Sequence, residues 1–353
     1  MTATDEPHVL LRTEGRAGFI TLNRPRAINA LTHPMVLGID EALTAWERDP
    51  AVETVVIDGA GERGLCAGGD IRAIHDDARA GGSASAGFWR DEYRLNARIA
   101  RFPKPYVAFM DGIVMGGGVG VSAHGSVRIV TERSRVAMPE TGIGFVPDVG
   151  GTYLLSRAPG ELGTHLALTG TPVGAADALL TGLADHVVRS VDLPRLAAEL
   201  TRAPAHEVLP GFARTPVTPG ELADQREWID ACYAADTVET VIDRLLDSGV
   251  PEAKEAATTL LGRSPTALKV TLAALRRARR LDSLESVLDM EFRLSCAALS
   301  SHDLVEGIRA QVVDKDRDPR WSPPELSAVT DEAVARYFGP PSTGDLGLAA
   351  HTP

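Results

Sequence analysis

Short apolar runs alternate with longer amphipathic segments through the first half of the chain. Residues 53–59 (ETVVIDG) and 106–110 (YVAFM) are continuous apolar stretches. This pattern is typical of strands in a sheet that is covered on both faces. Residues 34–48 instead repeat apolar positions every three or four residues, which predicts an amphipathic helix. The alternation of strands and helices indicates an α/β fold.

The chain also begins with two short runs rich in β-branched residues, 8–14 and 18–23, around a Glu-Gly-Arg turn. Their spacing predicts a β-hairpin. Further predicted elements are strands at 127–131 and 135–137, a helix at 88–101 and a flexible link at 81–87.

After about residue 152 the pattern becomes almost entirely helical. The predicted helices are 160–168, 175–181, 193–201, 219–235, 238–248, 251–261, 265–279 and 283–300. We expect residues 1–200 to form the α/β core and residues 201–338 to form a helical region that packs on it. Residues 339–353 are rich in Pro, Gly, Ser and Thr, so we expect them to form a disordered tail.

Composition narrows the choice of protein class. The chain has 353 residues and a net charge of −12, which argues against a nucleic-acid partner. Its three cysteines have no paired spacing and fit a reducing compartment. No basic, apolar leader opens the sequence, and no apolar run reaches the length of about 18 residues that a membrane span requires. We therefore expect a cytoplasmic protein without a membrane partner.

Common catalytic signatures are absent from the sequence. It contains no P-loop, no dinucleotide-binding glycine pattern, no zincin motif, no G-x-S-x-G and no Cys/His cluster with metal-ligand spacing. We therefore expect no metal and no redox cofactor.

The most informative stretch lies between residues 115 and 153. Three consecutive glycines, at 116–118, open a predicted helix, Gly117–His124, whose bare N–H groups could hold an anion or a developing oxyanion. Glu140 and Asp148 follow on loops. Each feature also has an ordinary explanation: close packing for the glycines, a helix cap or ion pair for Glu140, a turn for Asp148. Glu92, on the 88–101 helix, is by default a solvated charge.

Several segments taken together resemble the crotonase (enoyl-CoA hydratase/isomerase) superfamily, in its order and at its spacing. They are LNRPRAINAL at 22–31, CAGGDIR at 66–72, KPYVAFMDGIVMGGGVG at 104–120 and MPETGIGFVPDVGG at 138–151. Four more resemble the branch of 3-hydroxyisobutyryl-CoA hydrolases: DEYRLN at 91–96, SPTALKVTL at 264–272, MEFRLS at 290–295 and HDLVEGIRAQVVDKDRDPRW at 302–321. The resemblance covers residues 8–338. It implies a spiral of ββα units with a helical C-terminal region.

The resemblance also implies a coenzyme A thioester as substrate. The thioester carbonyl oxygen would lie between the backbone N–H groups of Gly69 and Gly117. Hydratases of the superfamily use two glutamates. The second matches Glu140, but the first matches Gly120, which has no carboxylate. Asp148 stands where the hydratases usually have glycine. This exchange is the hydrolase pattern.

The implied mechanism gives each acid a role. Glu140 would attack the thioester carbonyl or activate a water to do so, and the sequence leaves both routes open. Asp148 would bind the substrate 3-hydroxyl or help transfer protons. Glu92 would line the acyl pocket.

Coenzyme A itself is expected to contact the two early motifs. Arg26 is a candidate for a phosphate group, although a plain surface arginine is an equal alternative. Ala67 and Ile71 could flank the adenine. Lys269 and Lys315 are further candidates for a phosphate.

Two alternatives remain at this stage. One is an enoyl-CoA hydratase or isomerase, and the other is a non-catalytic acyl-CoA-binding protein. The sequence leaves open whether the chain forms a homo-oligomer.

Overall fold

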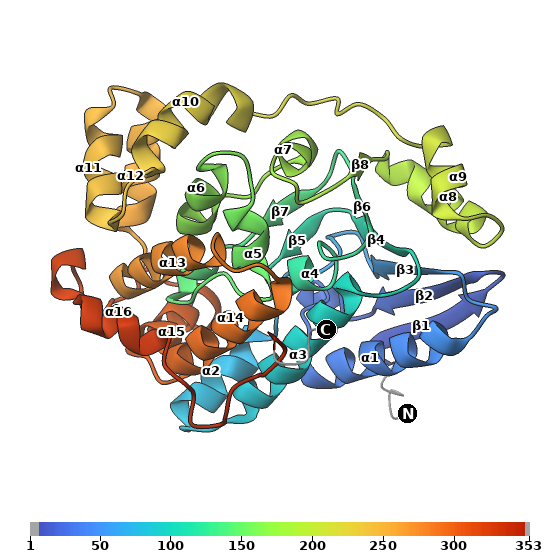
Figure 1. The fold of residues 1–353 in the computed structure, drawn as a ribbon, viewed down its shortest axis with the longest axis horizontal. Coiled ribbons are helices and arrows are strands. Elements are labelled where there is room, and N and C mark those ends of the chain that lie inside the picture. Colours follow the sequence, from blue (N-terminus) through green and yellow to red (C-terminus); the bar gives the residue numbers. More distant parts are fainter. Residues whose placement is uncertain (1–6, 350–353) are drawn as a thin grey trace.

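The computed structural model describes residues 7–349 and contains a mixed sheet surrounded by helices (Figure 1). The six strands have the order β1-β2-β3-β4-β6-β8, in which only the β1–β2 hairpin is antiparallel. They are β1 (Val9–Glu14), β2 (Ala17–Leu22), β3 (Thr54–Gly59), β4 (Tyr106–Met110), β6 (Val127–Val130) and β8 (His186–Val187). A second, parallel pair consists of β5 (Ile113–Met115) and β7 (Arg135–Ala137).

The helices follow in chain order. They are α1 (His33–Arg48), α2 (Ile71–Arg79), α3 (Ala84–Ala100), α4 (Gly117–Gly120), α5 (Gly151–Ser156), α6 (Leu162–Thr169), α7 (Ala175–Leu180), α8 (Leu193–Leu200), α9 (Ala205–Val208), α10 (Leu222–Tyr233), α11 (Val238–Asp247), α12 (Pro251–Leu261), α13 (Pro265–Ala278), α14 (Leu284–Leu299), α15 (His302–Ile308) and α16 (Asp331–Tyr337). Short 3₁₀ turns occur at η1 (Pro25–Ala27), η2 (Glu140–Ile143), η3 (Ser190–Asp192), η4 (Leu209–Gly211) and η6 (Leu326–Ala328), and a π-helical turn at η5 (Arg309–Val313).

Both faces of the main sheet are covered, as the apolar run at 53–59 predicted. In β3, Val55 and Ile57 belong to the core that contains the apolar face of α1. Val56, which points the other way, packs in a second cluster with Leu193 and Leu196 of α8. The α/β class and the largely helical second half are therefore confirmed. No helix within residues 7–349 is long and apolar enough to cross a membrane.

The structure differs from the prediction at α3, α4 and β8. Helix α3 begins at Ala84, so part of the predicted flexible link at 81–87 is helical. The Asp77 carboxylate accepts hydrogen bonds from the Ala84 and Ser85 N–H groups (3.3 and 2.7 Å), which caps this helix start from a neighbouring element. Helix α4 is a single turn rather than an eight-residue helix. Strand β8 was missed because it has only two residues.

The segment 339–349 also differs from the predicted tail. Arg90 of α3 donates hydrogen bonds to the carbonyl oxygens of Thr343, Gly344 and Asp345 (3.1, 2.7 and 2.9 Å). Arg293 of α14 pairs with the Asp345 carboxylate at 2.8 Å, and Leu346 is buried. This part of the segment therefore lies against the protein rather than free of it, while residues 350–353 fall outside the described structure.

The C-terminal helices return to the α/β core. Helix α14 packs against α3 and α5, and α15 packs against α2 (Figure 1). Segments that are far apart in the sequence thus meet at one place.

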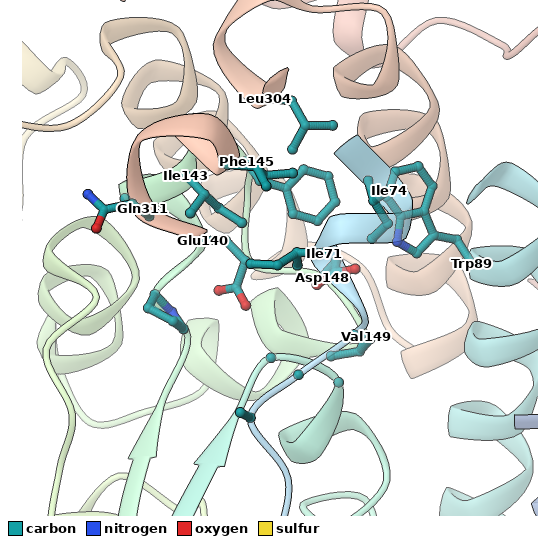
Figure 2. Close-up of a pocket in the computed structure, with 18 of the residues that line it drawn as sticks. Ile71, Ile74, Trp89, Glu140, Ile143, Phe145, Asp148, Val149, Leu304 and Gln311 are labelled. Carbon is teal, nitrogen blue, oxygen red and sulfur yellow. The ribbon is translucent and has the colours of Figure 1, made fainter. Parts of the chain in front are cut away.

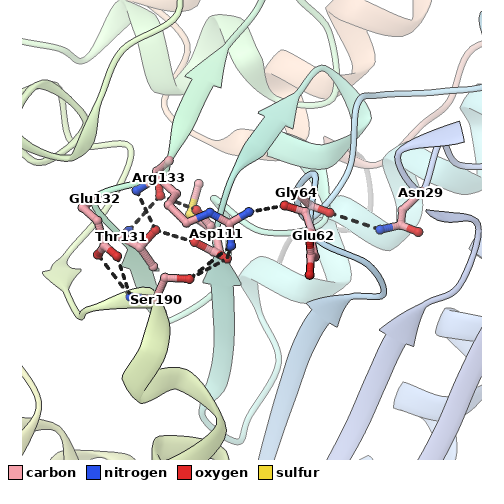
Figure 3. Close-up of polar contacts among 10 residues, drawn as sticks. Asn29, Glu62, Gly64, Asp111, Thr131, Glu132, Arg133 and Ser190 are labelled. Atoms are coloured by element: carbon pink, nitrogen blue, oxygen red, sulfur yellow. Dashed lines mark hydrogen bonds and ion pairs between the residues drawn. The ribbon is translucent and has the colours of Figure 1, made fainter. Parts of the chain in front are cut away.

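A polar network fixes the loops at the ends of β3, β4 and β6 (Figure 3). The Asp111 carboxylate accepts hydrogen bonds from Thr131, Arg133 and Ser190 (2.5, 3.0 and 3.0 Å). The buried Asn29 side chain donates to the Gly64 carbonyl oxygen at 3.1 Å. These contacts hold the loop that leads to the CAGGD turn.

Candidate active site

A cavity of about 270 Å³ lies between the α/β core and the C-terminal helices (Figure 2). Its polar lining comes from the CAGGD turn, the start of α4, η2 and the loop before α5. One wall is aromatic, because Trp89 stacks on Phe145 with a ring-centroid distance of 5.4 Å. The other apolar lining residues are Ile71, Ile74, Phe88, Ile143, Val149, Leu304 and Ile308.

Gly69 and Gly117 lie next to each other in the lining of this cavity. A Cβ atom built on Gly117 would lie 3.3 Å from the Gly69 nitrogen and 2.7 Å from Glu92 Oε1, so a side chain there would collide with the site. A Cβ on Gly69 would make only ordinary contacts with Phe88 and Ile74. Neither glycine N–H has a backbone acceptor recorded within residues 7–349. Two unpaired donors are thus available, although a one-turn helix supplies little macrodipole.

Glu140 begins η2 and is buried, with 6% of its surface exposed. Its Oε1 lies beside Gly116, where a Cβ would approach it to 2.9 Å, and its Oε2 has no hydrogen-bond partner. Burial and the nearby charge of Asp148 raise its pKa well above the usual glutamate range. The side chain points into the cavity, and Asp148 lies next to it (Figure 2).

Asp148 is buried in the same cavity and accepts a 2.6 Å hydrogen bond from the Tyr93 hydroxyl. Burial raises its pKa to about 7, and the Tyr93 hydrogen bond opposes this shift. The next residue, Val149, has a left-handed backbone with φ of 53°, which is rare for a β-branched residue. The loop therefore holds a strained turn beside a candidate catalytic carboxylate.

Gly120 and this strained turn depend on each other. A Cβ on Gly120 would lie 2.7 Å from Val149 Cβ and 2.9 Å from Asn96 Nδ2, so the Val149 side chain takes the space next to this glycine. The His124 ring contacts the Val149 carbonyl oxygen at 2.7 Å. Burial lowers the His124 pKa to about 4, so the ring is neutral and Nε2–H donates this bond. A side chain at position 120 would therefore collide with Val149, the residue that follows Asp148.

Glu92 is not a solvated charge. It is 2% exposed, lines the cavity from α3, and its Oε1 has no hydrogen-bond partner. Burial and the Asp148 charge raise its pKa well above the usual range. Three buried carboxyl groups, of Glu92, Glu140 and Asp148, therefore share one cavity.

The candidates for coenzyme A contacts separate into two groups. Ala67 and Ile71 line the cavity, while Arg26 is exposed on η1 and is not among the lining residues. Lys269 pairs with Glu239 at 2.6 Å and donates to the Val329 carbonyl oxygen, so the prediction that it meets a phosphate is unsupported. Lys315 lies in an exposed loop after η5.

Sequence reasoning overlooked several residues of the site. Arg263, between α12 and α13, is the one basic residue among those of 7–349 that line the cavity. Ser295 of α14 contacts the Tyr93 hydroxyl at 2.7 Å. Glu291 accepts hydrogen bonds from the Gly150 and Thr152 N–H groups (2.6 and 2.9 Å). The MEFRLS motif could have indicated Glu291 and Ser295, because the two polar residues are four positions apart and share one helix face.

The described residues contain no group of three or more His, Cys, Asp or Glu side chains arranged to hold a metal ion. The expectation that the protein needs no metal and no redox cofactor stays a prediction.

A cavity with two unpaired backbone N–H groups and buried acids, on this fold, indicates an enzyme of acyl thioesters. The sequence profile of the enoyl-CoA hydratase/isomerase family matches residues 17–338. The chain therefore belongs to this family, and its predicted crotonase-type fold is confirmed.

Proteins named 3-hydroxyisobutyryl-CoA hydrolase, mitochondrial, are similar over nearly the whole chain. The one from Gallus gallus is 42% identical over 96% of this chain and 91% of that protein. The one from Rattus norvegicus is 43% identical over 97% of this chain and 91% of that protein. Their names place them in mitochondria, which contradicts our prediction of a cytoplasmic location, and we withdraw that prediction. It rested on an opening segment that lies partly in residues 1–6, outside the described structure.

Solved structures with similar folds carry other names. A carnitinyl-CoA dehydratase from Mycobacterium thermoresistibile is 54% identical, with a TM-score of 0.93, over 96% of this chain and 98% of that one. An enoyl-CoA hydratase from Rhodobacter sphaeroides is 45% identical, with a TM-score of 0.89, over 96% of this chain and 99% of that one.

Proposed function

We propose that this protein hydrolyses 3-hydroxyisobutyryl-CoA to 3-hydroxyisobutyrate and free coenzyme A, a step of valine breakdown. The observation that carries the proposal is the combination of a glycine at position 120 with Asp148 in the cavity. The site lacks the carboxylate that family hydratases have at position 120, and it has gained one next to Glu140. Relatives named as this hydrolase over nearly the full chain support the same conclusion.

In the proposed reaction the thioester carbonyl oxygen accepts hydrogen bonds from the Gly69 and Gly117 N–H groups. These donors stabilise the negative charge that develops on that oxygen. Ionised Glu140 then either attacks the carbonyl carbon or takes a proton from an attacking water. In the first route the C–S bond breaks, coenzyme A leaves as the thiolate, and water opens the mixed anhydride. In the second route the water oxygen adds directly and the same C–S bond breaks.

Asp148 would accept a hydrogen bond from the substrate 3-hydroxyl. That bond would disperse the Asp148 charge, which raises the Glu140 pKa in the empty site. Substrate binding would therefore favour the ionised form of Glu140. Glu92 lies on the same side of the cavity and would also face the hydroxyl. An acyl group without a hydroxyl would leave these buried acids unpaired, which selects against it.

A second candidate is reversible addition of water to an enoyl-CoA, the chemistry named for the two similar solved structures. The position of Glu92 favours it, because its Oε1 lies beside Gly117 and could replace the missing acid at position 120. This reaction would use Glu92 and Glu140 as the acid–base pair and would release no thiol.

The test compares three substrates. Free thiol release is followed for 3-hydroxyisobutyryl-CoA, and the enoyl absorbance is followed for crotonyl-CoA and carnitinyl-CoA. We expect thiol release from the first and no hydration or dehydration of the others. Glu140→Gln and Asp148→Asn should each reduce kcat by about 10²–10⁴-fold, the range for removal of a general base or nucleophile.

The matched control is Asp91→Asn. This carboxylate precedes Glu92 on α3 but pairs with His33 at 2.7 Å instead of facing the cavity. It should leave kcat within a few fold of the original value. Rapid hydration of crotonyl-CoA or dehydration of carnitinyl-CoA, without thiol release, would contradict the proposal and support the second candidate.

A further inference from the structure

A chain of hydrogen bonds connects the C-terminal helix α14 with Asp148. The Ser295 Oγ lies 2.7 Å from the Tyr93 hydroxyl oxygen, which lies 2.6 Å from Asp148 Oδ2. Ser295 and Tyr93 are fully buried and Asp148 is 5% exposed. Three elements that are distant in the sequence, α14, α3 and the loop before α5, therefore contribute one buried chain of polar groups.

The direction of the protons in this chain follows from the number of donors. A tyrosine hydroxyl has one hydrogen, and an ionised carboxylate can only accept. Tyr93 therefore donates to Asp148, and Ser295 must donate to the Tyr93 oxygen. Both hydrogen bonds point toward Asp148, and each polarises the next.

The acids and the histidine near Asp148 do not stabilise its charge. Glu92 of α3, Glu140 of η2 and Glu291 of α14 are acids. The His124 ring is neutral and is bonded to the Val149 carbonyl oxygen. Within residues 7–349, Tyr93 is the one side chain with a recorded hydrogen bond to the Asp148 carboxylate.

We infer that Tyr93 is a positioning residue that holds Asp148 ionised and turned toward the acyl group, with Ser295 of α14 polarising the tyrosine. The inference rests on the proposed function for the role of Asp148. The hydrogen bond occupies Oδ2 and leaves Oδ1 to receive the substrate 3-hydroxyl. A short bond to a charged acceptor is of the strong, directional kind.

The test is the pH dependence of kcat/KM for 3-hydroxyisobutyryl-CoA, read from the thioester absorbance. Glu140 and Asp148 are both needed as anions, so the ascending limb of the profile reports both carboxyl groups, and Tyr93 stabilises the Asp148 anion. Removal of the hydroxyl in Tyr93→Phe therefore raises the Asp148 pKa, and the ascending limb of the profile moves to higher pH. We expect a move of about one pH unit, the scale of one charge-assisted hydrogen bond. Activity should fall about tenfold below the limb and recover largely above it.

Ser295→Ala provides a second variant with a weaker effect. It keeps the tyrosine but removes the donor that polarises it, so the limb should move in the same direction by less. This variant also carries the test if Tyr93→Phe fails to fold.

The matched control is Tyr233→Phe. Tyr233 is fully buried, and its hydroxyl contacts His165 Nδ1 at 3.0 Å, outside the cavity. The ascending limb of the kcat/KM profile of Tyr233→Phe should stay at the same pH as in the original protein. Equal loss of activity at every pH in Tyr93→Phe, or no change at all, would overturn the inference and leave Tyr93 a purely structural residue.

A measurement without turnover separates this inference from the proposed function. The carboxyl titration of Asp148 is followed by infrared difference spectroscopy and assigned by its loss in Asp148→Asn. An upward shift in Tyr93→Phe, in a protein that does not hydrolyse the substrate, would refute the function and keep the positioning role. Hydrolysis without any shift would refute the positioning role alone.

Discussion

Val149 shows how a single unfavourable residue conformation can serve a site. A β-branched residue in the left-handed region costs about 1–3 kcal/mol, and such a residue persists only when its surroundings fix it. Here Gly120 makes room for the side chain, and His124 holds the carbonyl oxygen. The strain places Asp148 in the cavity. A side chain restored at position 120 would displace Val149, so Gly120→Glu alone could not rebuild a two-glutamate site.

Gly117 offers the clearest test of the two backbone donors. In Gly117→Ala the new methyl group would fall 2.7 Å from Glu92 Oε1 and 3.3 Å from the Gly69 nitrogen, where the substrate oxygen is expected. The backbone N–H remains in this variant, but the methyl group takes the place of the substrate oxygen. We expect kcat/KM to fall by about 10²–10³-fold, as much as when an oxyanion donor is removed, with the protein still folded. Steady-state kinetics and a thermal melt check this.

The control for that variant is Gly38→Ala on α1, where an added Cβ meets nothing within 4 Å. It should leave kcat/KM unchanged and stabilise the helix by up to about 1 kcal/mol. Normal turnover in Gly117→Ala would show that the substrate oxygen does not lie between the Gly69 and Gly117 nitrogens.

Helix α14 acts on the site through one face. Ser295 lies four positions after Glu291, so both side chains project toward α3 and the loop before α5. Glu291 accepts hydrogen bonds from two backbone N–H groups and the Thr152 hydroxyl. Burial raises its pKa to about 8 despite these donors. Helix α14 thus holds the backbone that follows Asp148 through Glu291, and it holds Tyr93, the hydrogen-bond partner of Asp148, through Ser295.

Removal of the Glu291 carboxylate should destabilise the folded protein, because it leaves buried hydrogen-bond donors without an acceptor. In Glu291→Ala the Gly150 and Thr152 N–H groups lose their acceptor while remaining buried. We expect the free energy of unfolding to fall by about 2–4 kcal/mol, the cost of buried donors left without partners. Denaturant unfolding measures it.

Arg293→Ala on the same helix is the comparison. Its partly exposed pair with Asp345 should contribute at most about 1 kcal/mol. A Glu291→Ala variant as stable as Arg293→Ala would show that the Glu291 carboxylate is dispensable.

The cavity is formed between two regions of the molecule, the α/β core and the helical C-terminal region. The α/β core supplies the glycine turns and Glu140, while α14 and α15 supply the supports of Asp148 and part of the apolar wall. We therefore treat the helical C-terminal region as part of the site rather than as an appended domain. Residues 339–349 extend this region back onto α3, where Arg90 binds three of its carbonyl oxygens.

Truncation after Gly339 tests the importance of that last segment. It removes the buried Leu346 and the partners of Arg90 and Arg293. We expect a loss of about 2–3 kcal/mol in the free energy of unfolding, mostly from the apolar burial. Denaturant unfolding of the full chain and the truncated chain provides the measurement. Equal stabilities would favour the free tail that the composition predicted.

Much of the fold could be predicted because it follows from local patterns. The apolar runs at 53–59 and 106–110 gave strands close to their observed bounds, and helical spacing placed α11, α12 and α13 within one residue at each end. The early start of α3 could not be predicted, because its cap is Asp77 of another helix. The candidate residues Gly69, Gly117, Glu92, Glu140 and Asp148 all line one cavity. Their chemical roles stay predictions.

The sequence by itself determined the α/β class, the family, and the acids and glycines that meet in the cavity. These depend on periodicity and on residue types that a linear chain displays. Only the tertiary structure decided the state of those acids. Asp148 and its loop are approached by Tyr93 of α3, by Glu291 and Ser295 of α14, and by His124. Burial raises the pKa of each carboxyl group in the cavity. Neither long-range contact nor burial can be seen in a sequence, because both arise only when distant segments pack together.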